Sequence, residues 1–135
     1  MSRRILALTA AAALATAGMI LTAGPASAAE TCTDFVSDGA ELRICTSLYS
    51  PSAGNVVASG RTIELHEYLR RHQITVSLQR QNPSGGWDTL ATASDDKGVE
   101  EASATTTAFH NTGRLRACAT GGLYGGHETA TVCTP

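Results

Sequence analysis

Histidine and carboxylate side chains are the groups in this sequence that could carry out catalysis or hold a metal ion. The four histidines are His66, His72, His110 and His127. They lie far apart along the chain, and none has a Cys, Asp or Glu partner at the spacing that metal sites use. Asp95-Asp96 and Glu100-Glu101 are paired carboxylates, but they flank a polar turn, where turn formation and solvation account for them. The sequence therefore predicts no metal site and no cofactor.

Motifs for nucleophilic or metal-assisted catalysis are also missing from the sequence. It contains no G-x-S-x-G elbow, no H-E-x-x-H pair and no glycine-rich phosphate loop. We therefore expect a protein that is not an enzyme. The alternative is a small secreted hydrolase whose site is assembled from residues distant in sequence. Such a hydrolase would need a concave site where titratable groups converge.

Two short stretches carry side chains typical of protein-binding surfaces. Residues 121–126 read GGLYGG, so two large apolar residues stand at the expected tip of a glycine-rich hairpin. Glycines are costly to order, and the tip is more readily explained if a partner buries it. The alternative is that the tip folds back onto the domain. In the second stretch a tyrosine neighbours two arginines, both residue types enriched in binding hot spots. The predicted partner-binding residues are Leu123, Tyr124, His127, Tyr68, Arg70 and Arg71.

Residues 1–28 are expected to be an export leader. Arg3 and Arg4 precede an apolar stretch rich in Ala and Leu, and Ala26-Ser27-Ala28 forms a small-x-small cleavage site. A membrane anchor would need about 20 apolar residues, whereas this stretch is shorter and Gly24-Pro25 interrupts it. A basic pair occurs in most leaders, so ordinary secretion is favoured, with twin-arginine export as the alternative. We expect residues 29–135 to form a secreted domain with no membrane association after cleavage.

Charge argues against a nucleic-acid partner. The chain has 10 basic and 12 acidic residues, and loss of Arg3 and Arg4 with the leader makes the balance more acidic. Arg70-Arg71 is the only basic doublet after the leader, and no basic patch with interleaved aromatic residues occurs. We therefore expect a protein partner.

The chain is organised around residues 73–93, where apolar and polar residues alternate most clearly. Ile74, Val76 and Leu78 share one face of a predicted strand that must be buried. Residues 82–86 are a cluster of turn formers, after which the alternation restarts at Trp87. A lone hairpin is marginal in water, so other strands must cover this apolar face and the tryptophan.

Four cysteines, an even number in an exported domain, indicate two disulfides, for which sequence alone permits three pairings. An Asp-Gly turn at 38–39 predicts a hairpin whose register sets Cys32 opposite Cys45, in a pair where side chains approach closely. A hairpin centred on Gly125-Gly126 likewise sets Cys118 opposite Cys133. The glycine-rich strand ends specify this register less strongly, because they permit slippage. Both predicted bridges therefore staple local hairpins.

The remaining segments complete a chain of about seven to nine short strands. Residues 66–72 are expected to form a loop or one loose turn, and residues 99–109 a Thr- and Ala-rich edge strand. In the strand that follows, Leu115, Ala117 and Ala119 are expected to face inward. Frequent turn signals with no clear helix predict an all-β, antiparallel sandwich or barrel.

The central stretch resembles the immunoglobulin-like β-sandwich modules of secreted and surface proteins from actinobacteria and related bacteria. The resemblance covers residues 74–119 and lies in the runs VSLQR, GGW, TLAT, SDDKG and GRLRACA. It implies an antiparallel immunoglobulin-like β-sandwich. Such modules serve as spacers, adhesion domains, inhibitors and adaptors, so the resemblance does not select a function. This chain departs from them in having stapled hairpins and a single copy.

A stand-alone, disulfide-locked module is expected to be a secreted, non-enzymatic protein-binding domain. We expect an adaptor subunit of an extracellular complex, such as the toxin particles that some filamentous bacteria export. The alternative within the same class is an inhibitor of a secreted hydrolase.

Overall fold

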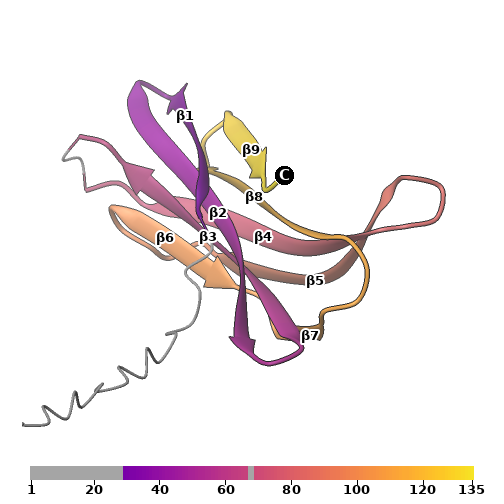
Figure 1. The fold of residues 1–135 in the computed structure, drawn as a ribbon. Helices are drawn as coiled ribbons and strands as arrows, with labels where there is room; N and C mark the ends of the chain where they lie inside the picture. The colour runs from indigo at the N-terminus through magenta and orange to yellow at the C-terminus, as the bar shows by residue number, and fades with distance from the viewer. Residues whose placement is uncertain (1–28, 67–68) are drawn as a thin grey trace, which may run out of the picture.

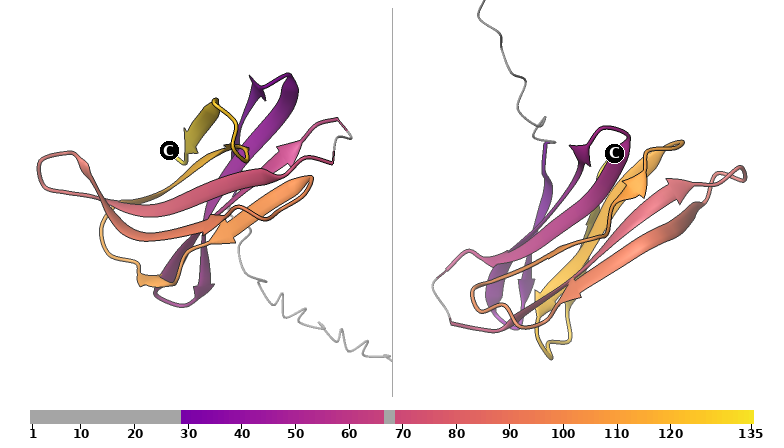
Figure 2. Two further views of the ribbon diagram at one scale, coloured as in Figure 1. Left: turned by 180° about the vertical axis from the view of Figure 1, so that it is seen from behind. Right: turned by 90° about the horizontal axis from the view of Figure 1, so that it is seen from below.

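The computed structural model describes residues 29–66 and 69–135, which form two antiparallel sheets packed face to face (Figures 1 and 2). No helix occurs in these residues, as the sequence predicts. The strands are β1 (Thr31–Ser37), β2 (Ala40–Ser52), β3 (Asn55–Glu64), β4 (His72–Gln81), β5 (Trp87–Asp95), β6 (Glu101–Thr105), β7 (Phe109–His110), β8 (Leu115–Leu123) and β9 (Thr129–Cys133).

The strand order is that of an immunoglobulin-like sandwich. One sheet runs β1-β2-β3-β6, with β7 also pairing with β3, and the other runs β5-β4-β8-β9. Strands β2, β3 and β6 take the places of A, B and E, while β5, β4, β8 and β9 take those of C′, C, F and G. Strand β1 is an additional strand outside β2. The predicted fold class is confirmed.

The predicted apolar face of β4 forms the centre of the core. Ile74, Val76 and Leu78 are all but completely buried, and they pack with Ile44 of β2 and Ala119 of β8. Full burial of such side chains stabilises a fold by about 1.5–3 kcal/mol each. The alternation of apolar and polar residues over 74–78 therefore correctly predicts which side chains of β4 lie at the centre of the core.

Glycines let the two sheets approach each other closely. A Cβ atom on Gly60 of β3 would lie 2.7 Å from Val76 Cγ2 and 2.9 Å from Ala119 Cβ in the opposite sheet. A Cβ on Gly121 of β8 would meet Thr62 Oγ1 of β3. The Thr62 hydroxyl also donates a hydrogen bond of 3.2 Å to the Gln73 carbonyl across the sandwich.

Both disulfides have the predicted pairing. Cys32 is bonded to Cys45 between β1 and β2, and Cys118 to Cys133 between β8 and β9. The Asp-Gly turn adopts positive φ angles at both central residues, 46° and 78°. Positive φ at both positions is the requirement of a type I′ hairpin turn, which sets the register of the first bridge.

The prediction that Trp87 joins the buried face is wrong. Leu90 is the extra residue of a β-bulge in β5, where the pairing with β4 shifts by one position. A bulge reverses the alternation of faces beyond it. Trp87 therefore lies half-buried on the outer face of its sheet, where the Arg116 guanidinium is 4.1 Å from the ring centroid.

The single strand expected over residues 99–109 is two strands, β6 and β7. Between them, Thr106 Oγ1 accepts a hydrogen bond of 3.0 Å from the Ala58 amide, so a side chain replaces a backbone partner there. The edge position is confirmed, because β6 ends the path of its sheet.

The connection between β3 and β4 crosses from one sheet to the other. The loop predicted for 66–72 is confirmed for its described part except at His72, which begins β4, and an isolated bridge pairs Arg71 with Val99. The expected leader, 1–28, and residues 67–68 lie outside the described residues. Across residues 29–66 and 69–135, no helix has the length and apolarity that a membrane crossing requires.

The contact at Gly60 leads to a stability prediction. Gly60→Val places a branched side chain against Val76 and Ala119 and should lower the free energy of unfolding by about 1–3 kcal/mol or more, as overpacking does. Thr92→Val, on the exposed face of β5, is the control and should change it by less than about 0.5 kcal/mol. Chemical denaturation of the oxidised protein measures both values. Equal stability of the two variants would contradict the close packing of the sheets.

Candidate functional site

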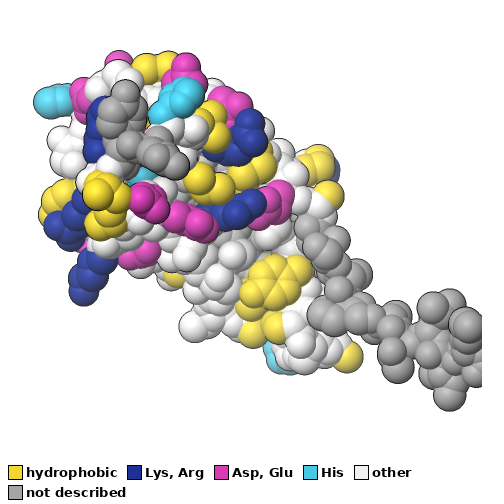
Figure 3. All heavy atoms as spheres, turned by 90° about the vertical axis from the view of Figure 1, so that its left-hand side faces the viewer, with side chains coloured by type: hydrophobic (Ala, Val, Ile, Leu, Met, Phe, Trp, Pro, Cys, Tyr) yellow, Lys and Arg dark blue, Asp and Glu magenta, His cyan; other side chains and the backbone are white. Residues whose placement is uncertain are grey.

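One end of the sandwich gathers the exposed apolar side chains. Five large apolar residues are exposed in the described part of the chain: Val36, Leu65, Leu69, Val99 and Tyr124. Leu69 is 80% exposed and Tyr124 49%. All five lie where the β1–β2, β3–β4, β5–β6 and β8–β9 connections meet, which we call the apolar end. Figure 3 looks onto it and shows apolar side chains bordered by acidic ones.

Backbone hydrogen bonds hold these connections together. The Leu65 amide donates to the Glu41 carbonyl at 2.9 Å, and the His72 amide donates to the Gly98 carbonyl at 2.8 Å. The Glu100 amide donates to the Arg70 carbonyl at 3.1 Å. The apolar end is therefore a composite surface built from both sheets.

The two stretches predicted to bind a partner converge at this end. The Arg71 guanidinium lies 3.8 Å from the centroid of the Tyr124 ring, and the Tyr124 amide donates to the Arg71 carbonyl at 2.9 Å. Arg71 also pairs with Asp96, with 3.7 Å between Nη2 and Oδ1. Residues more than 50 positions apart in sequence thus share one surface, which alternation within single strands does not reveal.

The prediction that Leu123 is exposed for a partner is wrong. Its side chain is only 6% exposed and packs with Ala40 and Leu42. Strand β8 continues through Leu123, which pairs with His72, so the alternation directs its side chain inward. The two apolar residues of the expected tip therefore lie in different environments, Leu123 in the core and Tyr124 on the surface.

Arg70 approaches a buried polar cluster at the base of the apolar end. Its Nη1 donates to the Asp38 carbonyl at 3.2 Å, and its Nε lies 3.8 Å from Glu64 Oε1. His72 Nε2 donates to Glu64 Oε2 at 3.2 Å. The Glu64 side chain is 2% exposed and that of His72 is 0% exposed. Burial of a carboxylate is costly unless it is paired, and the Arg70 guanidinium and the His72 ring are the partners of Glu64.

Two atoms of this cluster remain without a hydrogen-bond partner within the described residues: Glu64 Oε1 and His72 Nδ1. Sequence reasoning missed the cluster. Glu64 and His72 each stand at the end of an alternating stretch, and only the crossover between the sheets brings them together.

A pocket of about 710 Å³ opens beside Glu64, between the β3–β4 connection and residues 99–101. Its lining includes apolar Leu65, Leu69 and Val99 and acidic Glu64, Glu100 and Glu101. Glu100 has a φ of 68°, which is uncommon for a residue other than glycine. Such strained positions cost on the order of 1–3 kcal/mol, and they cluster at functional sites.

The other predicted site residues have no role in the pocket. His127 is exposed on the β8–β9 turn, and its side chain makes no hydrogen bond or ion pair with another described residue. Tyr68 lies outside the described residues. The described chain has one cluster with the spacing of metal ligands, Glu30, Cys32 and Cys45, whose two sulfurs are joined in a disulfide. Disulfide sulfurs are not the thiolates that metals bind.

Asp95 anchors the connection that carries Val99 and Glu100. Its carboxylate accepts hydrogen bonds from the Lys97 amide at 3.0 Å and the Ser103 amide at 3.1 Å. These two amides, with that of Lys97 contributing most, lower the pKa of Asp95 below its usual value.

Comparison with known proteins assigns no family to this chain. It matches no protein-family model, no curated protein and no solved structure. Its function must therefore be inferred from the apolar end itself.

Because Leu123 lies in the core and Tyr124 on the surface, truncating these two neighbouring residues should lower stability by very different amounts. Leu123→Ala should lower the free energy of unfolding by about 2–5 kcal/mol, because it leaves a cavity beside Leu42. Tyr124→Ala removes an exposed ring and one cation–π contact and should cost only about 1 kcal/mol or less. Denaturant titration measures both. A larger loss for Tyr124→Ala would mean that its ring is part of the core.

The lowered pKa of Asp95 predicts a pH-dependent contribution to stability. Because the folded pKa lies below the unfolded one, ~3.9, the stabilisation is present above that value and is lost as pH falls through the folded pKa. Asp95→Asn should therefore be less stable than the natural chain at neutral pH, and the difference should shrink in acid. Thermal melts from pH 7 to pH 2 test this, with exposed Glu128→Gln as the control. An NMR titration that gives Asp95 an ordinary pKa would contradict it.

Proposed function

We propose that this protein is a secreted, non-enzymatic binding module that engages a protein partner through the apolar end. The observation that carries the proposal is the collection of all five exposed large apolar side chains at that one end. Isolated exposed apolar residues are ordinary, but apolar groups gathered on one surface and rimmed by polar ones mark interaction sites. Tyr124 and Arg71 add two of the three residue types enriched in binding hot spots.

Export is supported by two features. Residues 1–28 have the organisation of a leader, and the domain contains two disulfides, which persist in oxidising compartments. Disulfides also suit a small extracellular domain that presents a preorganised binding surface.

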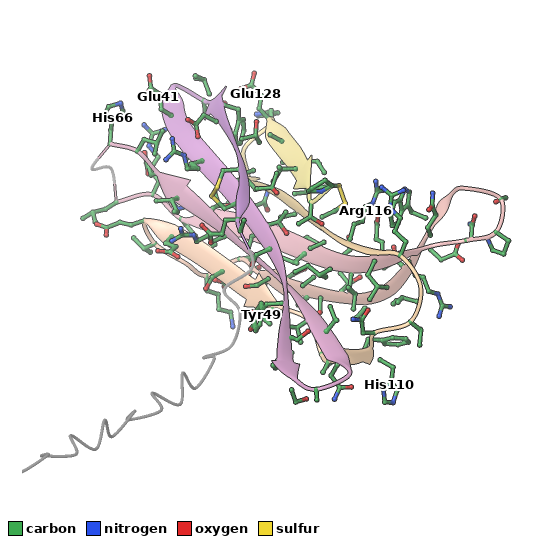
Figure 4. All side chains as sticks on the ribbon, viewed as in Figure 1. Glu41, Tyr49, His66, His110, Arg116 and Glu128 are labelled. Carbon is green, nitrogen blue, oxygen red and sulfur yellow. A yellow bond between two sulfur atoms is a disulfide. The ribbon has the colours of Figure 1, made fainter. Side chains whose placement is uncertain are left out.

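An adaptor role is supported by a second, chemically different surface. At the other end of the sandwich, Arg116 and Arg114 surround the half-buried Trp87, with guanidinium carbons 4.1 and 5.8 Å from its ring centroid (Figure 4 labels Arg116). A subunit that joins two components needs two separate surfaces, whereas an inhibitor needs one. We therefore favour an adaptor of an extracellular complex, with a secreted toxin particle as one such assembly.

The Glu64–His72 pair is better suited to structure than to catalysis. His72 is fully buried and Glu64 nearly so, which denies a substrate access to the imidazole. Within the described residues, no serine or threonine hydroxyl is hydrogen-bonded to either side chain. A nucleophile and its base are normally within hydrogen-bond reach.

Capture from culture supernatant tests the proposed surface. Tagged wild-type protein should recover a stoichiometric partner, and Leu69→Ser should weaken capture about tenfold or more, because a buried interface side chain is worth on the order of 1–2 kcal/mol. His110→Ala, at the opposite end, is the control and should bind normally (Figure 4). Unchanged capture by Leu69→Ser would contradict the apolar end as the binding surface. If the partner is a hydrolase that loses activity on binding, the inhibitor role would replace the adaptor role.

A further inference from the structure

We infer that the pocket of the apolar end receives a basic side chain, arginine, from the partner protein. This inference rests on the proposed function and adds the chemistry by which the partner is recognised.

The pocket is acidic, and part of its charge is uncompensated. Glu64, Glu100 and Glu101 line it, and no lysine or arginine of the described chain does. The remaining polar side chain of the lining, His66, is engaged by Glu41 at 2.8 Å. The carboxylates of Glu100 and Glu101 have no ion pair or hydrogen bond with another described side chain. A cation entering the pocket would therefore meet free acceptors.

Glu64 provides a second and independent indication of a ligand. Its side chain is almost fully buried at the pocket, and its Oε1 has no hydrogen-bond partner in the described part of the chain. Arg70 Nε lies 3.8 Å from this oxygen, which is an ion pair but longer than a hydrogen bond. A carboxylate has about four acceptor sites, so Glu64 retains capacity for a donor from outside the chain. A buried acceptor left unpaired is costly, and a ligand that donates to it would remove that cost.

The geometry favours an organic cation over a metal ion. Glu64, Glu100 and Glu101 do not form a group whose carboxylate oxygens converge within 4.8 Å of one another, which a shared metal ion would require. Carboxylates spread along a pocket wall suit the separated N–H donors of a guanidinium.

The apolar part of the lining fits the stem of such a side chain. Leu65, Leu69 and Val99 are exposed beside the glutamates. Long basic side chains bury their methylene stems along apolar surface while the charged head meets polar groups. Apolar walls with acidic groups beside them therefore complement an arginine next to apolar residues on a partner.

Two peptides of equal shape test the inference. The 15N-labelled oxidised protein is titrated with acetyl-Leu-Arg-Leu-amide and with the same peptide carrying citrulline, which is uncharged, in place of arginine. The arginine peptide should shift the amide signals of residues 63–66 and 99–101 saturably. The affinity of the citrulline peptide should be lower by at least about tenfold. Added salt should weaken the arginine peptide only.

Variants locate the charge effect. Glu101→Gln should weaken the arginine peptide about two- to fivefold, whereas Glu128→Gln, the same change on the β8–β9 turn outside the pocket, should not. Glu101 is exposed, so this variant avoids the risk to folding that a change at buried Glu64 carries. Equal binding of both peptides, or no saturable shift, would overturn the inference. Shifts that depend on protein concentration alone would mean that a second copy of the chain occupies the pocket, and this result would also overturn the inference. If these tests fail while Leu69→Ser still abolishes capture, the proposed function stands without this recognition mode.

Discussion

The close approach of the two sheets is the constraint on which the structure depends. Gly60 and Gly121 face the opposite sheet where a side chain would not fit, and much of the remaining core is alanine. A thin core of this kind leaves no room for a ligand between the layers, so recognition is confined to the ends and outer faces. Small domains with modest cores commonly rely on disulfides.

Local signals in the sequence were sufficient for much of the fold. The Asp-Gly turn and the two cysteines around it define one hairpin, and Ile74, Val76 and Leu78 define the core face, because each depends on residues close in sequence. Trp87 was misplaced because a single bulge residue, Leu90, exchanges the two faces of its strand. Nothing in the local pattern marks that residue as extra.

The candidate site was only partly predictable, because the order of the strands in the sheets brings together residues that are distant in sequence. Arg71 and Tyr124 were each predicted from the sequence to bind a partner, but the contact between them depends on β4 and β8 being neighbours. Leu123 was assigned to the surface because the glycines around it suggest a flexible tip, whereas the register of β8 buries it. The Glu64–His72 pair could not be expected, since it forms where the chain passes from one sheet to the other.

The placement of the two disulfides has a mechanical consequence for a chain that joins larger bodies. Each bridge closes a loop within one hairpin, the bonded cysteines being separated by 13 and 15 positions in the sequence, and neither bridge links one sheet to the other. Tension applied through the two ends of the described chain would pass directly across the bridges and bypass residues 33–44 and 119–132. The outer strands β1 and β9 would be shielded from extension, and the load would fall on the pairing of β2 with β3 and of β4 with β8. The extensible length of the domain is therefore limited to its central segment for as long as the cystines stay oxidised.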